Sequence, residues 1–318
     1  MLARTADNLY WLARYMERAD HLARIVSVTR RLAALPSPNE DRRAEWDSAL
    51  ASIGVDEPFL ARYGKVTPET AIDYVVFDAE NPSSIANCLE YGRSNARAVR
   101  TALTAETWDM VNSGWLEFKK LQSAHTARRF DPDTLQQMLD LAMKIALDVD
   151  GSSYRTMLRN DAYWFGRLGL YIERADNTAR ILDVKYNILL PETEAVGGSL
   201  DYFQWTAILR SVSALTAYNW VYHEPIKPWL IADLLILRPE MPRSLISCLE
   251  NIARFLDAIA AAYEATGESQ ARARQSLTKL QGATVDHVFA VGLHEFITSF
   301  VEDNSQLGQA IAKQYLVD

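Results

Sequence analysis

Residues 12–25 read LARYMERADHLARI, and residues 168–181 read LGLYIERADNTARI. Aligned without a gap, both stretches contain Glu-Arg-Ala-Asp and, two residues later, Ala-Arg-Ile, at an offset of 156 residues. Apolar side chains in and around the first stretch recur every three or four residues, the spacing of one face of an α-helix, at Leu9, Leu12, Met16, Ala19, Ala23 and Val26. The stretch predicts a helix, and its recurrence predicts two copies of one helical unit.

The repetition continues along the chain. Pro82-Ser83-Ser84-Ile85 corresponds to Pro242-Arg243-Ser244-Leu245, and Cys88-Leu89-Glu90 corresponds to Cys248-Leu249-Glu250, now at an offset of 160. Several matches in one order, with a slowly growing offset, indicate duplication rather than chance. We therefore expect an all-α fold of two multi-helix units, residues 1–150 and 151–318. The two units should pack as one body, because the seam at residues 150–154 is too short for a free linker.

The rest of the pattern is also helical. Pro36 and Pro38 are expected to end the first helix, and Ser83 or Ser84 is the predicted N-cap of a helix that extends to Arg100. Helical spacing predicts further helices at residues 106–121, 131–147, 158–190, 203–217, 228–237, 244–265, 270–279 and 285–301, and a short last one up to 316. No clean alternation with a period of two is present, so no sheet is expected.

Composition and charge exclude several functional classes. The 318 residues include 33 basic and 41 acidic side chains, which gives a net charge of −8. No nucleic-acid binding is expected, because neutralising phosphates requires a basic surface. No apolar run reaches the roughly 18 residues of a membrane span, and the N-terminal pattern is not that of a signal peptide. With two cysteines and no disulfide framework, a cytoplasmic protein is expected.

The repeated Glu-Arg motif is the main candidate site. Its polar residues are Arg14, Glu17, Arg18, His21 and Arg24 in the first copy and Glu173, Arg174, Asp176 and Arg180 in the second. On the first helix this face lies opposite the apolar stripe. It is either solvated and held by i,i+4 pairs, or it lines a groove between the copies where arginines bind a carboxylate or phosphate. Recurrence favours a central ion-pair network, structural or ligand-binding, in which Arg18 and Arg174 are more buried than typical arginines and each contacts a carboxylate.

Several motifs together resemble the bacterial alpha-E family, which is named for an α-helical domain with a Glu-Arg motif. They are Trp11, Arg14, Tyr15 and Arg24 around the first motif, residues 180–186 after the second, and Asn81-Pro82-Ser83-Ser84-Ile85 with Arg93, Asn95 and Arg97 downstream. The resemblance covers nearly the whole chain. One departure is Leu170, which occupies the position equivalent to Arg14. The resemblance implies a role beside a circularly permuted ATP-grasp enzyme, and hence in ATP-dependent amide or peptide ligation.

A second candidate for anion binding is Ser84 with Arg93 and Arg97. The dipole and free N–H groups of a helix N-terminus favour an anion, although a simple cap followed by an exposed basic face explains the same residues. Ala253 and Asp257 occupy the equivalent positions in the second copy, so a symmetric pair of sites is not expected. Cys88 and Cys248 are interpreted as small buried residues rather than nucleophiles.

Metal and nucleotide motifs are missing from the sequence. No two histidines are spaced i,i+4, and no His-Glu-x-x-His or glycine-rich phosphate loop is present. No metal, cofactor or ATP binding is therefore expected.

Three functions remain open at this stage. The first is an accessory protein that is the partner of an ATP-grasp ligase and positions that enzyme or its peptide-like substrate. The second is an enzyme, a transferase or hydrolase on amide or peptidyl substrates, that uses a groove between the two Glu-Arg motifs. The third is a helical scaffold. An aromatic region at Tyr202, Trp205, Tyr218, Trp220 and Tyr222 packs in the core or anchors a partner.

Overall fold

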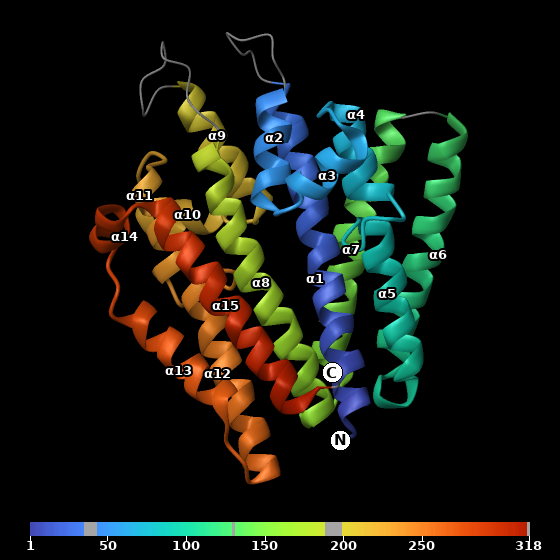
Figure 1. The fold of residues 1–318 in the computed structure, drawn as a ribbon, viewed down its shortest axis with the longest axis vertical. Coiled ribbons are helices and arrows are strands. Elements are labelled where there is room, and N and C mark those ends of the chain that lie inside the picture. The colour runs from blue at the N-terminus through green and yellow to red at the C-terminus, as the bar shows by residue number, and fades with distance from the viewer. Residues whose placement is uncertain (35–42, 129–130, 188–198, 317–318) are drawn as a thin grey trace.

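The computed structural model describes residues 1–34, 43–128, 131–187 and 199–316, and within these ranges the chain is helical and has no strand (Figure 1). The all-α prediction is confirmed. The first half comprises α1 (Ala3–Leu32), α2 (Arg43–Ser52), α3 (Asp56–Tyr63), α4 (Pro68–Ile72), the π-helical turn η1 (Asp73–Phe77), α5 (Ile85–Ala98), the short 3₁₀ turn η2 (Arg100–Ala102), α6 (Ala105–Arg128) and α7 (Pro132–Thr156). The second half comprises α8 (Asp161–Asn187), α9 (Ser199–Ser211), α10 (Leu215–Tyr222), α11 (Pro228–Ala232), the π-helical turn η3 (Asp233–Leu237), α12 (Leu245–Tyr263), α13 (Glu268–Gln281), α14 (Val285–Val291) and α15 (Leu293–Tyr315).

The two helices that carry the Glu-Arg motifs, α1 and α8, pack against each other at the centre of the molecule (Figure 1). They run in the same direction, since Tyr10 lies against Gly169 and Glu17 against Arg174. At Gly169 the backbones approach so closely that a Cβ there would overlap the carbonyl oxygen of Tyr10. The polar faces of the motifs therefore meet inside the molecule, and α1 is buried on both its apolar and its polar side.

Each central helix is covered by an equivalent set of helices. In the first half α5 and α7 pack on α1, and in the second half α12 and α15 pack on α8. The next layer consists of α6 and α13 respectively. Two helices pack on the central helix of the other half: α2 packs on α8, and α9 packs on α1. The element order of one half recurs in the other, without η2 and with α14 added, while the common origin of the halves stays a prediction that a superposition will test.

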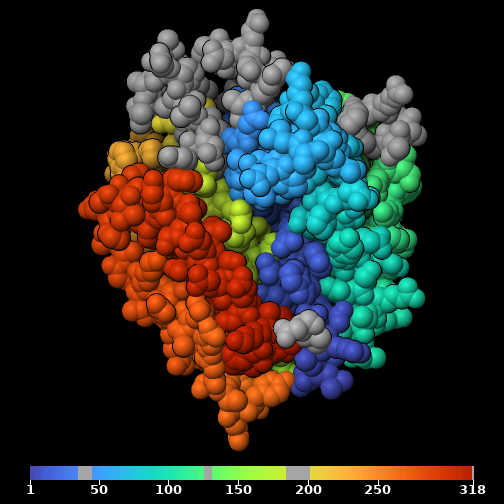
Figure 2. Space-filling model, viewed as in Figure 1, coloured from blue at the N-terminus to red at the C-terminus, as the bar shows by residue number. Residues whose placement is uncertain are grey.

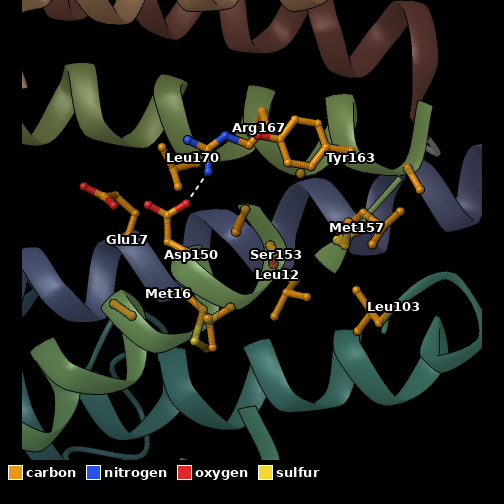
Figure 3. Close-up of a pocket in the computed structure, with 16 residues that line it drawn as sticks. Leu12, Met16, Glu17, Leu103, Asp150, Ser153, Met157, Tyr163, Arg167 and Leu170 are labelled. Atoms are coloured by element: carbon orange, nitrogen blue, oxygen red, sulfur yellow. Dashed lines mark hydrogen bonds and ion pairs between the residues drawn. The ribbon is translucent and has the colours of Figure 1, made fainter. Parts of the chain in front are cut away.

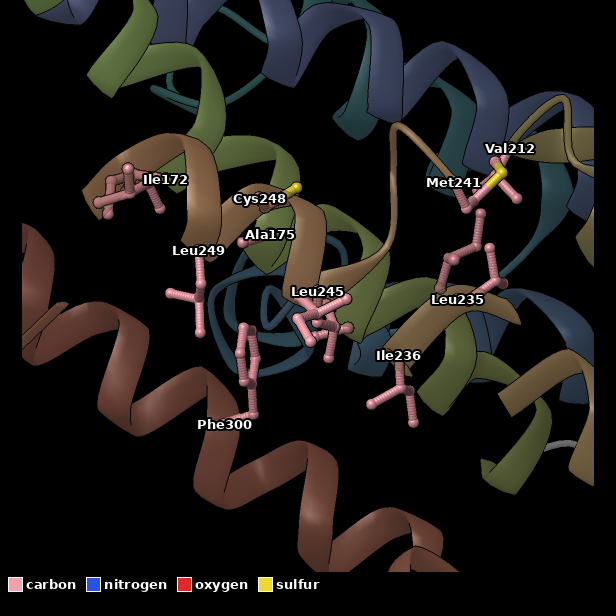
Figure 4. Close-up of a cluster of buried hydrophobic side chains, with 14 of the residues drawn as sticks. Ile172, Ala175, Val212, Leu235, Ile236, Met241, Leu245, Cys248, Leu249 and Phe300 are labelled. Atoms are coloured by element: carbon pink, nitrogen blue, oxygen red, sulfur yellow. The ribbon is translucent and has the colours of Figure 1, made fainter. Parts of the chain in front are cut away.

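Two apolar clusters form the core. One surrounds α8, α12 and α15 and includes Leu245, Leu249, Phe300 and Ile236 of η3, with Cys248 near Ala175 (Figure 4). The other joins α1 to α5, α6 and α7 and includes the whole apolar stripe predicted for the first helix apart from Leu9, which is buried in the first cluster. Both cysteines are fully buried, as the sequence predicts.

Several predicted boundaries are wrong for local reasons. The expected helix at 203–217 is broken after Ser211, where Ser213 takes a left-handed φ of 58°. The expected helix at 285–301 is broken at Gly292, and the rest continues as one helix to Tyr315. The seam expected at residues 150–154 lies inside α7, and the connection to α8 follows it at 157–160. Pro36, Pro38 and the end of the helix expected at 158–190 lie outside the described residues.

None of the helices in the described ranges combines the length and the apolar character that crossing a lipid bilayer requires.

Candidate functional site

The Glu-Arg motifs pair with each other across the α1–α8 interface. Arg18 donates from Nε and Nη2 to the two carboxylate oxygens of Glu173, at 2.6 and 3.1 Å. Arg174 does the same to Glu17, at 3.0 and 2.9 Å. Each arginine thus makes a two-point contact, the strongest geometry for this pair. The side chains of Arg18 and Arg174 are 22% and 12% exposed, so the predicted burial against carboxylates is confirmed.

Each glutamate accepts a second guanidinium, but the two come from different places. Glu173 accepts from Arg14 at 2.8 Å, one turn before Arg18 on α1. Glu17 accepts from Arg243 at 2.8 Å, from the loop before α12. Arg243 compensates for Leu170, the residue that replaces Arg14 in the second copy. Sequence reasoning placed Arg243 opposite Ser83 in the repeat but did not identify it as a site residue, although an arginine at that position was the available signal.

A second layer of ion pairs flanks the glutamates. Arg24 contacts Asp20 at 2.8 Å and Arg180 contacts Asp176 at 2.6 Å, both as i,i+4 pairs. Arg24 also donates to the carbonyl of Ser211 at the end of α9, and Arg180 donates to that of Ser52 at the end of α2. A cation is favourable at a helix C-terminus. Each central helix therefore holds the end of a helix from the other half.

The two central glutamates, Glu17 and Glu173, stay ionised. Burial alone favours the neutral acid, but the guanidinium groups of Arg18 and Arg14 outweigh it and lower the pKa of Glu173 to about 2. The pKa of Glu17 is also held well below its usual range, because Arg174 and Arg243 outweigh burial. Burial, with the charge of Arg180 beside it, lowers the pKa of His21 to about 3, so this ring is neutral at pH 7.

The network opens to the surface on the Glu173 side. Arg18, His21, Ser83, Asp176, Asn177 and Arg180 line a cavity of about 240 Å³. Arg18, Asp176 and Arg180 also border a groove of about 700 Å³ between α1, α8 and α15. In the space-filling view this groove is the hollow between α15 (red) and α1 and α2 (blue), with α8 (yellow-green) at its floor (Figure 2). The groove that the sequence proposed between the copies exists, and Arg14 borders it too.

A separate pocket lies where α1, α7 and α8 meet. It is mainly apolar and measures about 50 Å³, with Leu12, Met16, Leu103, Met157 and Leu170 on its walls (Figure 3). An ion pair between Arg167 and Asp150 lies at one side.

The second candidate anion site does not assemble. Ser84 is the N-cap of α5 as predicted, accepting from the backbone N–H of Asn87. Arg93 lies on the same helix and donates to Asn112 of α6 while its guanidinium stacks on Trp115. At 1.5 Å per residue it is roughly 13 Å along the axis from Ser84, and Arg97 is exposed further on. The residue of this region that does reach the Glu-Arg centre is Ser83, which accepts from Arg18 at 3.3 Å.

Reactive side chains near the centre are not activated. Burial raises the pKa of both Cys88 and Cys248 to about 12, despite the nearby arginines, so neither thiol forms a nucleophile at neutral pH. Among the described residues no three His, Cys, Asp or Glu side chains are grouped as a metal site.

The aromatic region divides into two parts. Trp205 and Tyr218 are buried in the core, and the hydroxyl of Tyr222 donates to Asp233. Trp220 is 77% exposed, and Tyr202 is also exposed.

Comparison with known proteins agrees with this architecture. No curated protein and no solved structure matches the chain. Residues 1–316 match a family described as a predicted α-helical domain with a conserved ER motif. The chain contains the sequence Glu-Arg twice within the matched residues, at the centre of the α1–α8 interface, and the match extends over nearly every residue of the helical body around it. The chain therefore belongs to the Alpha-E family.

Proposed function

We propose that this protein is an accessory, non-catalytic partner of an ATP-grasp amide or peptide ligase, and that it holds the peptide-like substrate in the groove between α1, α8 and α15. The observation that supports this most is the groove itself, whose floor combines two arginines, Arg18 and Arg180, with the carboxylate of Asp176. The arginines offer partners for the carboxylate of a peptide-like molecule, and the aspartate offers one for its ammonium group. The link to ligation comes from the resemblance of the Glu-Arg and Asn-Pro-Ser-Ser motifs to proteins that accompany such enzymes.

The alternative, an enzyme that uses the same groove, has the space but lacks a poised reactive group among the described residues. A general base needs a pKa near the working pH. Glu173 and His21 have pKa values of about 2 and 3, far below it. A nucleophile needs a lowered pKa or a neighbouring base, whereas the two thiols have raised pKa values. This set of residues is suited to binding charge rather than to moving protons.

Exposed aromatic side chains support the partner role. Tyr202, Phe203, Trp220 and Trp229 are exposed on α9, α10 and α11. Tyrosine and tryptophan are typical anchors of protein interfaces. The two free, buried cysteines fit a reducing compartment, so we place this role in the cytoplasm.

The test is co-purification with the proteins encoded beside this chain, followed by a ligation assay with and without it. We expect a complex with the ligase and faster ligation when the chain is present. We expect no saturable binding of Mg-ATP to the isolated chain by calorimetry. Amide hydrolysis or transfer by the chain alone would favour the enzyme alternative, and an assay that the chain never changes would remove the accessory role.

A further inference from the structure

We propose that the cavity beside Glu173 is a binding site for an amino-acid head group, an ammonium and a carboxylate on one carbon. This inference names the substrate class for the groove and rests on the proposed function for its link to ligation. It is carried by a comparison of the two halves at one pair of equivalent positions, Ser83 and Arg243.

In the second half, the equivalent space is filled by the protein itself. Arg243 bridges Glu17 and Asp20, donating at 2.8 Å to each. In the first half, the residue at this position is Ser83, whose short side chain reaches only Arg18. Asp176, the counterpart of Asp20, consequently accepts one hydrogen bond in the described structure, from Arg180. Its side chain is 23% exposed, against 4% for Asp20.

The cavity is thus the volume that a guanidinium occupies in the other half. In the second half this place holds the cation of Arg243, and the carboxylates of Glu17 and Asp20 are oriented to receive it. A ligand ammonium is the group that restores the missing contact to Asp176, because ionised donors and acceptors form the strongest hydrogen bonds in such sites.

The charge balance favours an anion on the same ligand. Glu173 and Asp176 face three guanidinium groups, those of Arg14, Arg18 and Arg180, an excess of one positive charge that equals the excess on the closed side. An ammonium alone raises the excess above that of the closed side, whereas a zwitterion does not. Arg18 Nη1 makes only a long 3.3 Å contact with Ser83, and Arg180 Nη1 one of 3.2 Å with Ser52, so both guanidinium groups keep N–H donors for a carboxylate.

His21 provides a second, independent observation. It lines the cavity and is only 4% exposed, yet its Nε2 has no hydrogen-bond partner in the described structure. A buried polar atom without a partner is costly and rare. Its Nε2 has almost no accessible surface, so a small shift of the ring is needed before the ligand's ammonium or carboxylate gives this nitrogen a partner, as donor or acceptor according to the tautomer.

Size and continuity match a head group with an extended tail. About 240 Å³ holds an ammonium, a carboxylate and a few carbons, and Arg18, Asp176 and Arg180 are shared with the 700 Å³ groove that receives the rest. The head group has two sources. One is a free amino acid, and the other is the end of a peptide whose terminal residue is joined through its side-chain carboxyl group. Both present the same ammonium and carboxylate to the cavity.

The test is titration calorimetry of the full chain with each free L-amino acid and with γ-glutamylglycine, whose glutamyl residue keeps both charged groups. Ser83→Arg refills the cavity in the way Arg243 does, and Asp176→Asn removes the ammonium partner with little change of shape. Ser94→Arg, at an exposed position of α5, the helix that follows Ser83, is the matched control. The Nα-acetyl and α-amide derivatives of the best ligand remove one charge each.

We expect saturable binding to the unmodified chain and to Ser94→Arg, with affinity at least about tenfold lower for Ser83→Arg, Asp176→Asn and both blocked derivatives. Tighter binding of γ-glutamylglycine than of free glutamate assigns the site to a linked chain, and the reverse assigns it to a free amino acid. If no probe saturates, or if Asp176→Asn binds like the unmodified chain, the inference is wrong. Should Ser83→Arg fail to fold, Asp176→Asn decides.

The ligation assay separates this inference from the proposed function. Amino-acid binding without any effect on ligation contradicts the accessory role and leaves the site intact. An effect on ligation without amino-acid binding contradicts the site and leaves the role intact.

Discussion

Glu17 and Glu173 are buried carboxylates that each accept two guanidinium groups. Their arrangement spreads the cost of burying charge over several strong hydrogen bonds, which is the condition under which buried ion pairs persist. Because each glutamate pairs with two arginines, the loss of one partner does not leave it fully unpaired. The network is therefore robust on the side that Arg243 closes and adaptable on the side that opens to the groove.

Removal of Arg174 is expected to destabilise the protein. Arg174→Ala takes away the two-point contact with Glu17 and leaves only Arg243, so the free energy of unfolding should fall by about 3 kcal/mol. Urea denaturation measures this. Arg274→Ala, which breaks an ion pair between well-exposed side chains, is the control and should change little. Equal losses in both variants would contradict a stabilising role for the central network.

His21 gives the protein a distinct pH dependence. Its pKa is about 3 in the folded state and near 6.5 in an unfolded chain. Between these values the unfolded chain binds the extra proton, so stability is full above pH 6.5 and falls as the pH drops towards 3. From pH 7 to 5 the loss due to this residue should be about 2 kcal/mol. His21→Asn, which copies Asn177 of the other half, should lack this part of the slope in denaturation curves. Identical slopes would show that the ring is not held neutral.

The individual side chains of the Glu-Arg site were predictable from the sequence in part. The sequence predicted that Arg18 and Arg174 are buried against carboxylates, since the same four residues recur on helices that otherwise differ. It did not predict that each pairs with the other copy's glutamate, because spacing along one helix defines a face but not the neighbour that covers it. Arg243 was overlooked for a related reason: it precedes a cap in a loop, where periodicity carries no information.

At the level of helices, the sequence predicted the two long central helices, α1 and α8, but missed several shorter elements and breaks. Sequence periodicity predicted both long helices, but the short helices α2, α3 and α4 were not predicted, because five to ten residues contain too few turns to show a period. The breaks at Ser213 and Gly292 were also missed. A left-handed φ at a serine leaves no composition signal, and Gly292 was followed and preceded by apolar residues that continue the helical pattern.

Gly169→Ala is expected to force α1 and α8 apart. The added Cβ meets the carbonyl of Tyr10, which is backbone and cannot rotate away, so a loss of about 1–3 kcal/mol is expected. Gly151→Ala in α7 is the matched control, since a Cβ there has no neighbour within 4 Å. It should stabilise the helix by up to about 1 kcal/mol. Thermal unfolding of both variants measures the contrast, and a Gly169→Ala protein as stable as the control would contradict the close approach.

The whole molecule is a pair of similar halves that depend on each other. The Glu-Arg pairs cross between them, and so do α2 and α9, each of which packs on the other half's central helix. Two halves with a similar order of helices, which differ at Ser83 and Arg243 among other positions, supply one closed ion-pair centre and one open one. Function can then change at the open centre while the closed one keeps the halves together.

This interdependence predicts that neither half folds alone. Cut at the α7–α8 connection, residues 1–156 keep Glu17 without Arg174 and Arg243, and residues 157–318 keep Glu173 without Arg14 and Arg18. Each fragment also exposes the central face that the other half covers. We expect each fragment alone to lack the cooperative thermal transition of the full chain, and the two fragments mixed to recover it together with a one-to-one complex by gel filtration. A further variant separates the two causes of instability. Glu17→Gln in the first fragment removes the unpaired buried charge, but the apolar face that the other half normally covers stays exposed. A first fragment that unfolds cooperatively by itself would show that the crossing contacts are dispensable, and that the halves are independent domains rather than one body.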